Sequence, residues 1–184
     1  MPDFLMKIIS FVLGIVTTLS MSMSSLTALV NRSNFSVASS FDTVSYEEQL
    51  VPQKDSDGWW TFTSDRPLKV VQFTDVHIGG GILSVKKDKK ALNAVAAMIT
   101  AEKPDLVVFT GDQIKGYSAT FKGNTKQKIT ETLGEIFRPV IERKIPFTAT
   151  FGNHDRDCGI GNNVQAEIYK SFPGFVSGAP RHPD

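Results

Sequence analysis

The stretch LKVVQFTDVHIGGG, residues 68–81, decides how this chain folds. Its first seven residues are mostly apolar and partly β-branched, which is typical of a strand buried within a parallel sheet. The run ends at Asp75 and His77, and the three glycines of residues 79–81 then break the strand. The stretch therefore predicts a buried strand that delivers two polar side chains at its carboxyl end.

The same arrangement occurs twice more, in DLVVFTGD at residues 105–112 and in PFTATFGNHD at residues 146–155. Apolar stripes at helical spacing predict a helix that ends before Pro104 and a second helix that Pro139 should kink or divide. A short third helix is predicted over residues 164–172. The order strand, helix, strand, helix, strand predicts an α/β fold, a parallel βαβαβ sheet with helices on its faces. The two stripes are Leu92, Val95, Ala96 and Ile99, and then Leu133, Ile136, Phe137, Val140 and Ile141.

Polar residues follow each of the three predicted strands: Asp75 and His77, then Asp112, then Asn153 and His154. Ligands of open parallel sheets collect outside the carboxyl ends of the strands, and neighbouring strands lie about 4.8 Å apart. Residues i and i+2 of an extended segment point the same way, so Asp75 and His77 should reach one ion. Taken singly, each motif is also typical of a turn or a helix cap. In combination they predict a metal site.

The residue types suggest separate roles at such a site. The carboxylate of Asp112 can share its oxygens between two cations, and the side-chain carbonyl of Asn153 offers a neutral ligand. A metal pair can hold a phosphoryl group and lower the pKa of a bound water. His154 is placed to supply a proton to a leaving group, and Asp155 could orient that imidazole.

These motifs resemble the first three motifs of the calcineurin-like metallophosphoesterases, in their purple-acid-phosphatase-like branch. The resemblance runs from about residue 68 to about residue 157. It implies a β-sandwich flanked by helices, of which this chain holds the βαβαβ half, and a dinuclear centre of Fe, Zn or Mn that hydrolyses phosphate esters. By position, Asp75 and His77 would bind the first metal, Asp112 would bridge, Asn153 would bind the second and His154 would assist catalysis.

Two features depart from that family pattern. Typical purple acid phosphatases have a tyrosine three positions after the motif aspartate, where this chain has Lys115, with Tyr117 two residues further on. The family also uses a later histidine and a Gly-His-x-His motif, whereas the chain holds only three histidines, His77, His154 and His182. We therefore expect the amino-terminal part of a longer enzyme, with weak metal binding and little or no turnover on its own. The alternative is a non-catalytic remnant that binds a ligand or a partner.

Charge balance and missing motifs argue against nucleic-acid binding and nucleotide binding. Twenty basic residues balance nineteen acidic ones, which gives no reason to expect nucleic acid as a partner. The three glycines of residues 79–81 do not match a dinucleotide-binding fingerprint, and no P-loop is present. The one cysteine, Cys158, is interpreted as a small, half-buried side chain rather than a soft metal ligand. Lys86, Lys87, Lys89 and Lys90 are interpreted as a solvated helix face, with phosphate steering as the alternative.

The first thirty residues are predicted to be a targeting segment. Lys7 precedes a dozen nearly uncharged positions, residues 8–19, and small polar residues follow, which is typical of a secretory signal peptide. An extended count of apolar residues would instead suggest a retained anchor, and a membrane contact is expected only in that case. Two sequons, at Asn31 and Asn34, are compatible with a secreted or lumenal glycoprotein. Residues 31–66 are predicted as an irregular lead-in with a short edge strand near Trp60. By the resemblance, residues 67–184 are predicted as the amino-terminal part of a calcineurin-like metallophosphoesterase domain.

Overall fold

The computed structural model describes residues 50–177. The predicted signal segment, both sequons and most of the lead-in fall within residues 1–49, and His182 falls within residues 178–184, so these lie outside the described part of the chain. Among the described helices, none is both long and apolar enough to cross a membrane.

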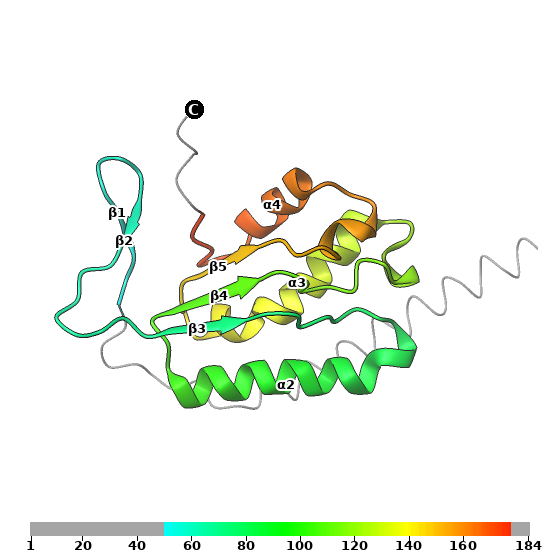
Figure 1. Cartoon of the computed structure of the whole chain (residues 1–184), viewed down its shortest axis with the longest axis horizontal. Helices are drawn as coiled ribbons and strands as arrows, with labels where there is room; N and C mark the ends of the chain where they lie inside the picture. Colours follow the sequence, from blue (N-terminus) through cyan, green and yellow to red (C-terminus); the bar gives the residue numbers. More distant parts are fainter. Residues whose placement is uncertain (1–49, 178–184) are drawn as a thin grey trace, which may run out of the picture. The chain divides into compact units, whose positions relative to one another are not determined.

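The predicted parallel sheet is confirmed (Figure 1). Strands β3 (Val70–Phe73), β4 (Leu106–Thr110) and β5 (Phe147–Thr150) lie side by side in that order, and all are parallel. The crossovers are helix α2 (Val85–Glu102) and helix α3 (Thr125–Glu142), and helix α4 (Asn162–Lys170) follows β5. Short 3-10 helices complete the described elements: η1 (Ile82–Ser84), η2 (Ala119–Phe121) and η3 (Asp155–Cys158).

One face of the sheet forms the core. Phe73, Phe109 and Ala149 are register partners across the three strands, and the ring of Phe109 also contacts Phe137 of α3 at 5.0 Å between centroids. Both stripes predicted from the sequence pack here, since their residues in α2 and α3 are almost all buried. The opposite face stays partly open to solvent, because Val70 is 46% exposed. The described residues thus form one helix-covered layer of a fold, as expected for part of a metallophosphoesterase sandwich.

Two local predictions differ from the structure. The strand near Trp60 exists as β2 (Trp60–Thr61), but it pairs with β1 (Gln53–Lys54) in a separate antiparallel hairpin and is not an edge of the main sheet. Of the kink or division predicted at Pro139, the division does not occur, because α3 is helical through Glu142. Pro139 has no backbone N–H to donate, and only three further residues of the helix follow it. The carbonyl of Pro139 accepts a hydrogen bond from Arg143 Nη1 at 3.0 Å.

Candidate metal centre

The loops after β3 and β4 continue side by side beyond the ends of the strands. The backbone N–H of Asp75 donates to the carbonyl of Gly111 at 3.1 Å, and that of His77 donates to the carbonyl of Asp112 at 3.0 Å. One residue later, Ile78 forms a parallel bridge with Ile114. These backbone contacts fix the positions of the polar side chains that the two loops carry.

Side-chain atoms of Asp75, His77 and Asp112 converge at this edge and lie within 4.8 Å of one another. Nε2 of His77 is 3.6 Å from Oδ1 of Asp75 and 3.9 Å from Oδ2 of Asp112. Metal–ligand bonds to nitrogen and oxygen are about 2.0–2.2 Å long, so two ligands of one ion lie about 3–4 Å apart. The three atoms are therefore too far apart for hydrogen bonds among themselves and fit the shell of a transition-metal ion.

The backbone at these residues differs from the extended geometry that the sequence argument assumed. Asp75, His77 and Asp112 all have left-handed φ angles, of 55°, 50° and 53°. Such angles are uncommon for residues other than glycine, and each costs on the order of 1 kcal/mol. The two loops hold this conformation through their mutual hydrogen bonds. Both side chains of the Asp75-Val-His77 motif still reach one point, but through a tight turn instead of strand alternation.

Asp155 holds the two loops together. Its Oδ2 accepts the backbone N–H of Asp112 at 2.9 Å and that of Gly152 at 2.7 Å. The residue is fully buried, and burial raises the pKa of its carboxyl group. Asp155 therefore ties the β4 loop to the β5 loop, and it does not contact the imidazole of His154 as the sequence analysis had suggested.

The carboxylate that contacts the His154 imidazole belongs to Asp157. Nδ1 of His154 lies 2.8 Å from Oδ2 of Asp157. This hydrogen bond is the main reason why the pKa of His154 is raised above its ordinary value. The His154 ring also lies 5.7 Å from the His77 ring and 5.0 Å from the edge-on ring of Tyr117. The bond through Nδ1 leaves Nε2 as the ring nitrogen available for proton transfer.

We expect the substitution Asp157→Asn to lower the pKa of His154 toward its unperturbed value, because the amide keeps the shape of the side chain but not its charge. An NMR titration of the three histidine Cε1 protons, assigned with His154→Gln, measures this directly. The matched control is Asp57→Asn, at an exposed residue of the β1–β2 hairpin. An unchanged His154 titration in Asp157→Asn would contradict the contact.

Asn153 and Asp112 come close through the β5 loop. Asn153 is exposed and lies between Gly152 and His154, whose backbone N–H donates to Oδ1 of Asp112 at 2.8 Å. A Cβ atom built on Gly152 would lie 2.2 Å from that same Oδ1. Glycine at 152 therefore lets the two loops approach closely enough for the carboxylate of Asp112 to be capped by the β5 loop.

We expect Gly152→Ala to displace the Asp112 carboxylate, to weaken metal binding about tenfold or more, and to lower the free energy of unfolding by about 1–3 kcal/mol, the usual cost of overpacking. Urea denaturation and isothermal titration with Mn²⁺ measure the two effects. Gly161→Ala is the control, because its added Cβ would meet no atom closer than 3.8 Å. Normal metal affinity in Gly152→Ala would contradict the close approach.

The structure also settles the position of Cys158. The side chain is 2% exposed, its thiol donates to the carbonyl of Asp155 at 3.0 Å, and burial raises the pKa of the thiol. A buried, protonated thiol is a poor metal ligand. Cys158 is thus a packing residue behind the β5 loop, as the sequence analysis preferred.

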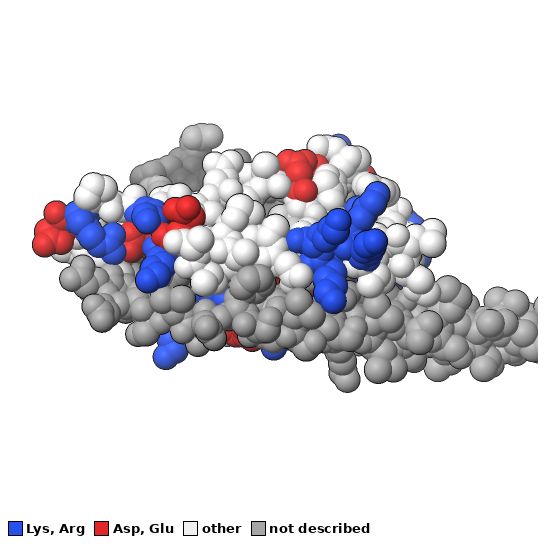
Figure 2. All heavy atoms as spheres, turned by 90° about the horizontal axis from the view of Figure 1, so that it is seen from below, with Lys and Arg blue, Asp and Glu red and all other residues white. Residues whose placement is uncertain are grey.

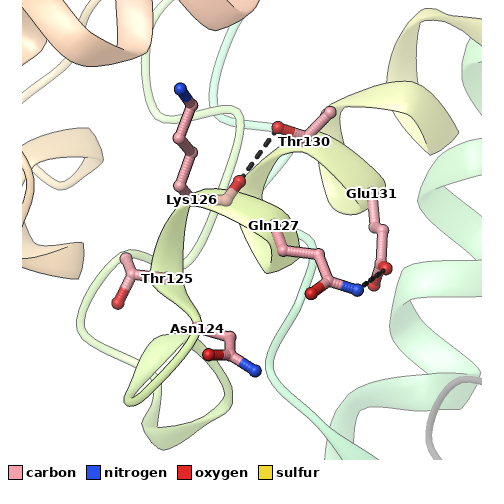
Figure 3. A pocket seen from close by; sticks show the side chains of 6 residues that line it. All are labelled: Asn124, Thr125, Lys126, Gln127, Thr130 and Glu131. Atoms are coloured by element: carbon pink, nitrogen blue, oxygen red, sulfur yellow. Dashed lines mark hydrogen bonds between the residues drawn. The ribbon is translucent and has the colours of Figure 1, made fainter.

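A surface hollow lies at the start of α3 (Figure 3). Two of its polar side chains bond within the helix, because Thr130 donates to the carbonyl of Lys126 and Gln127 donates to Oε1 of Glu131. Within residues 50–177, the only cluster of histidine, cysteine and carboxylate groups suited to an ion is the one at Asp75, His77 and Asp112. The lining residues are Asn124, Thr125, Lys126, Gln127, Thr130 and Glu131.

Comparison of the sequence with models of known families identifies the domain that carries this site. The model of the calcineurin-like phosphoesterase family matches residues 68–181. The chain belongs to this family. The match contains all three strand ends that carry the candidate site.

Several curated proteins are similar to this metallophosphoesterase chain. Phosphatase DCR2 of Saccharomyces cerevisiae is 34% identical over 121 residues, which cover 60% of this chain and 20% of the yeast protein. Probable inactive purple acid phosphatases 28 and 14 of Arabidopsis thaliana are 36% and 28% identical, and the matches cover 62% and 63% of this chain and 30% of each relative. The chain thus spans less than a third of the length of these relatives. No solved structure matches it significantly.

Asp157 and Tyr117 are the site residues that sequence reasoning missed. Asp157 stands three residues after His154 and belongs to η3, so its side chain turns back toward the ring. The signal for it was the spacing of three residues, but only if a helical turn had been predicted after the β5 loop. Nothing in the sequence pattern indicated that Tyr117 would lie against His154.

Proposed function

We propose that this chain contributes the amino-terminal part of a metal-dependent centre that hydrolyses phosphate esters. The observation that carries the proposal is the convergence of Oδ1 of Asp75, Nε2 of His77 and Oδ2 of Asp112 with spacings suited to one ion. Asp75 and His77 would hold a first metal, Asp112 would be shared between two, and Asn153 would contribute to the second. The family match supports this assignment.

Bound Fe, Zn or Mn ions would polarise a phosphoryl group and lower the pKa of water at the centre. The chain itself would supply the proton transfer. His154 borders the site, its Nδ1 is held by Asp157, and its Nε2 would donate a proton to the oxygen of the leaving alcohol. Tyr117, which is 56% exposed and in contact with the His154 ring, offers an aromatic surface to the leaving group.

A second candidate function is ligand or partner binding without turnover. Two relatives carry the words "probable inactive" in their names, which favours this alternative. The two candidates share the first metal ligands and differ in whether chemistry follows binding.

Hydrolysis of p-nitrophenyl phosphate by the full chain, supplied in turn with Mn²⁺, Zn²⁺ and Fe²⁺, tests the first candidate, because metal-dependent turnover would exclude the non-catalytic alternative. In an active chain, we expect His154→Ala to lower kcat about 100-fold or more, within the range for a lost general acid, while metal affinity changes little. Metal binding without turnover, in a chain that is folded by circular dichroism, fits both the non-catalytic alternative and the amino-terminal part of a longer enzyme. Absence of metal binding would contradict the first candidate.

A further inference from the structure

A charged and apolar projection lies immediately after the glycine loop. Ile82 and Leu83 of η1 are 41% and 99% exposed, which makes Leu83 the most exposed large apolar residue of the described chain. Four lysines follow in the first turns of α2. We call these six residues the basic tip: Ile82, Leu83, Lys86, Lys87, Lys89 and Lys90.

The positive charge of the basic tip is not neutralised locally. None of the four lysines forms an ion pair among residues 50–177. Figure 2 shows a group of Lys and Arg side chains toward the end of the molecule at which α2 begins, and further Lys and Arg side chains among acidic ones toward the opposite end. The side chain of Lys115 lies beside this loop, since a Cβ built on Gly80 would be 3.1 Å from its Cδ. The outer face is therefore cationic.

The one acidic residue in this segment points inward. Asp88 is buried, and its Oδ2 accepts the backbone N–H of Gly79 at 3.0 Å and the hydroxyl of Ser84 at 2.8 Å. The backbone N–H of Ser84 donates to the carbonyl of Gly81 at 2.9 Å. Asp88 thus fixes the turn from its buried side, and in this turn the side chain of Leu83 is exposed to solvent.

We propose that the basic tip docks on an anionic phospholipid bilayer, with Leu83 inserted among the acyl chains and the lysines on the headgroups. Transfer of an exposed leucine side chain from water into an apolar phase is favourable, and each lysine near an anionic surface adds to the attraction. A nucleic acid would satisfy the lysines but offers Leu83 no comparable phase, and residues 81–90 contain no aromatic side chain for base stacking. This surface goes beyond the proposed hydrolysis and would bring the centre close to a membrane.

The test places an environment-sensitive label at the tip. The variant Leu83→Cys is coupled to the fluorophore NBD, and Val164→Cys, at a 43% exposed residue of α4, is the matched control. Cys158 is buried and therefore little labelled. We expect NBD emission at position 83 to rise several-fold and shift to the blue with vesicles containing about one third phosphatidylserine in phosphatidylcholine, but not with phosphatidylcholine alone. The label at position 164 should respond little.

Charge variants test the lysines separately. In the labelled Leu83→Cys chain, Lys86→Glu with Lys87→Glu should weaken vesicle binding about tenfold or more. The control pair Lys54→Glu with Lys103→Glu should leave it unchanged. Asp112→Ala should also leave it unchanged, so failure of the metal proposal would not be mistaken for failure of this one.

Five results would overturn the membrane proposal. The first four are no response at position 83, an equal response to neutral vesicles, an equal response at position 164, and an equal loss in the control pair. A response of the same size to duplex DNA without vesicles would also overturn it and assign the lysines to a nucleic acid.

Discussion

Asp112→Ala is expected to abolish metal binding at the centre. The side chain supplies Oδ2 to the ligand cluster, and its Oδ1 accepts the backbone N–H of His154, so the substitution removes a ligand and also frees the β5 loop. Loss of an outer partner alone typically weakens metal affinity about 10–100-fold, and loss of a shared ligand should exceed this. Titration with Mn²⁺ followed by electron paramagnetic resonance measures the free ion directly.

Asp65→Ala is the matched control for this titration, because Asp65 is an exposed aspartate outside the candidate centre. It should bind Mn²⁺ like the unaltered chain. Any phosphatase turnover should disappear together with the metal in Asp112→Ala. Retained affinity in this variant would remove Asp112 from the centre and, with it, the shared-ligand role.

Glu135→Gln is expected to stabilise the protein at alkaline pH. Glu135 lies in α3 and is only 8% exposed, and burial together with the nearby charge of Asp88 raises its pKa to about 8. The ordinary pKa is 4.5, so between these values the folded protein binds the proton more tightly than the unfolded chain does. Stability should therefore be fully present below about pH 4.5 and fall as the pH rises through about 8.

The amide in Glu135→Gln cannot ionise, so the stability of this variant should not fall as the pH rises through about 8. Near pH 8.5 it should be more stable than the unaltered chain by roughly 4 kcal/mol, because a tenfold difference in proton affinity between the folded and unfolded chains corresponds to about 1.4 kcal/mol. Near pH 5 the two should be similar. Urea denaturation across this range measures the difference. Glu102→Gln, at an exposed position at the end of α2, should show no such trend. A constant difference between Glu135→Gln and the unaltered chain at all pH values would contradict the buried acid.

The sequence was sufficient for the sheet and for the convergence of its polar ends. Each strand is an apolar run, and parallel strands joined by helices must place their carboxyl ends together. Asp75, His77 and Asp112 could therefore be assigned to one site before their geometry was known. The family motifs in this region lead to the same assignment, and the match over residues 68–181 confirms the family.

The details that sequence could not give depend on contacts between loops. The left-handed backbone at Asp75 and His77 is held by hydrogen bonds between neighbouring loops. Asp and His are enriched in this conformation among residues other than glycine, but that preference is too weak to predict it at a given position. The contact with the His154 imidazole, which the sequence analysis assigned to Asp155 and which Asp157 makes, also depends on contacts between loops. Asp155 is drawn inward by two backbone N–H groups, which leaves Asp157, one helical turn after His154, to hold the imidazole.

The most direct test of the central claim is anomalous diffraction from crystals of the chain soaked in Mn²⁺. We predict a peak bounded by Oδ1 of Asp75, Nε2 of His77 and Oδ2 of Asp112, with bonds of about 2.0–2.2 Å. Crystals of Asp112→Ala should lack that peak. A well-ordered centre without a peak at saturating Mn²⁺, or a peak that persists in Asp112→Ala, would contradict the account.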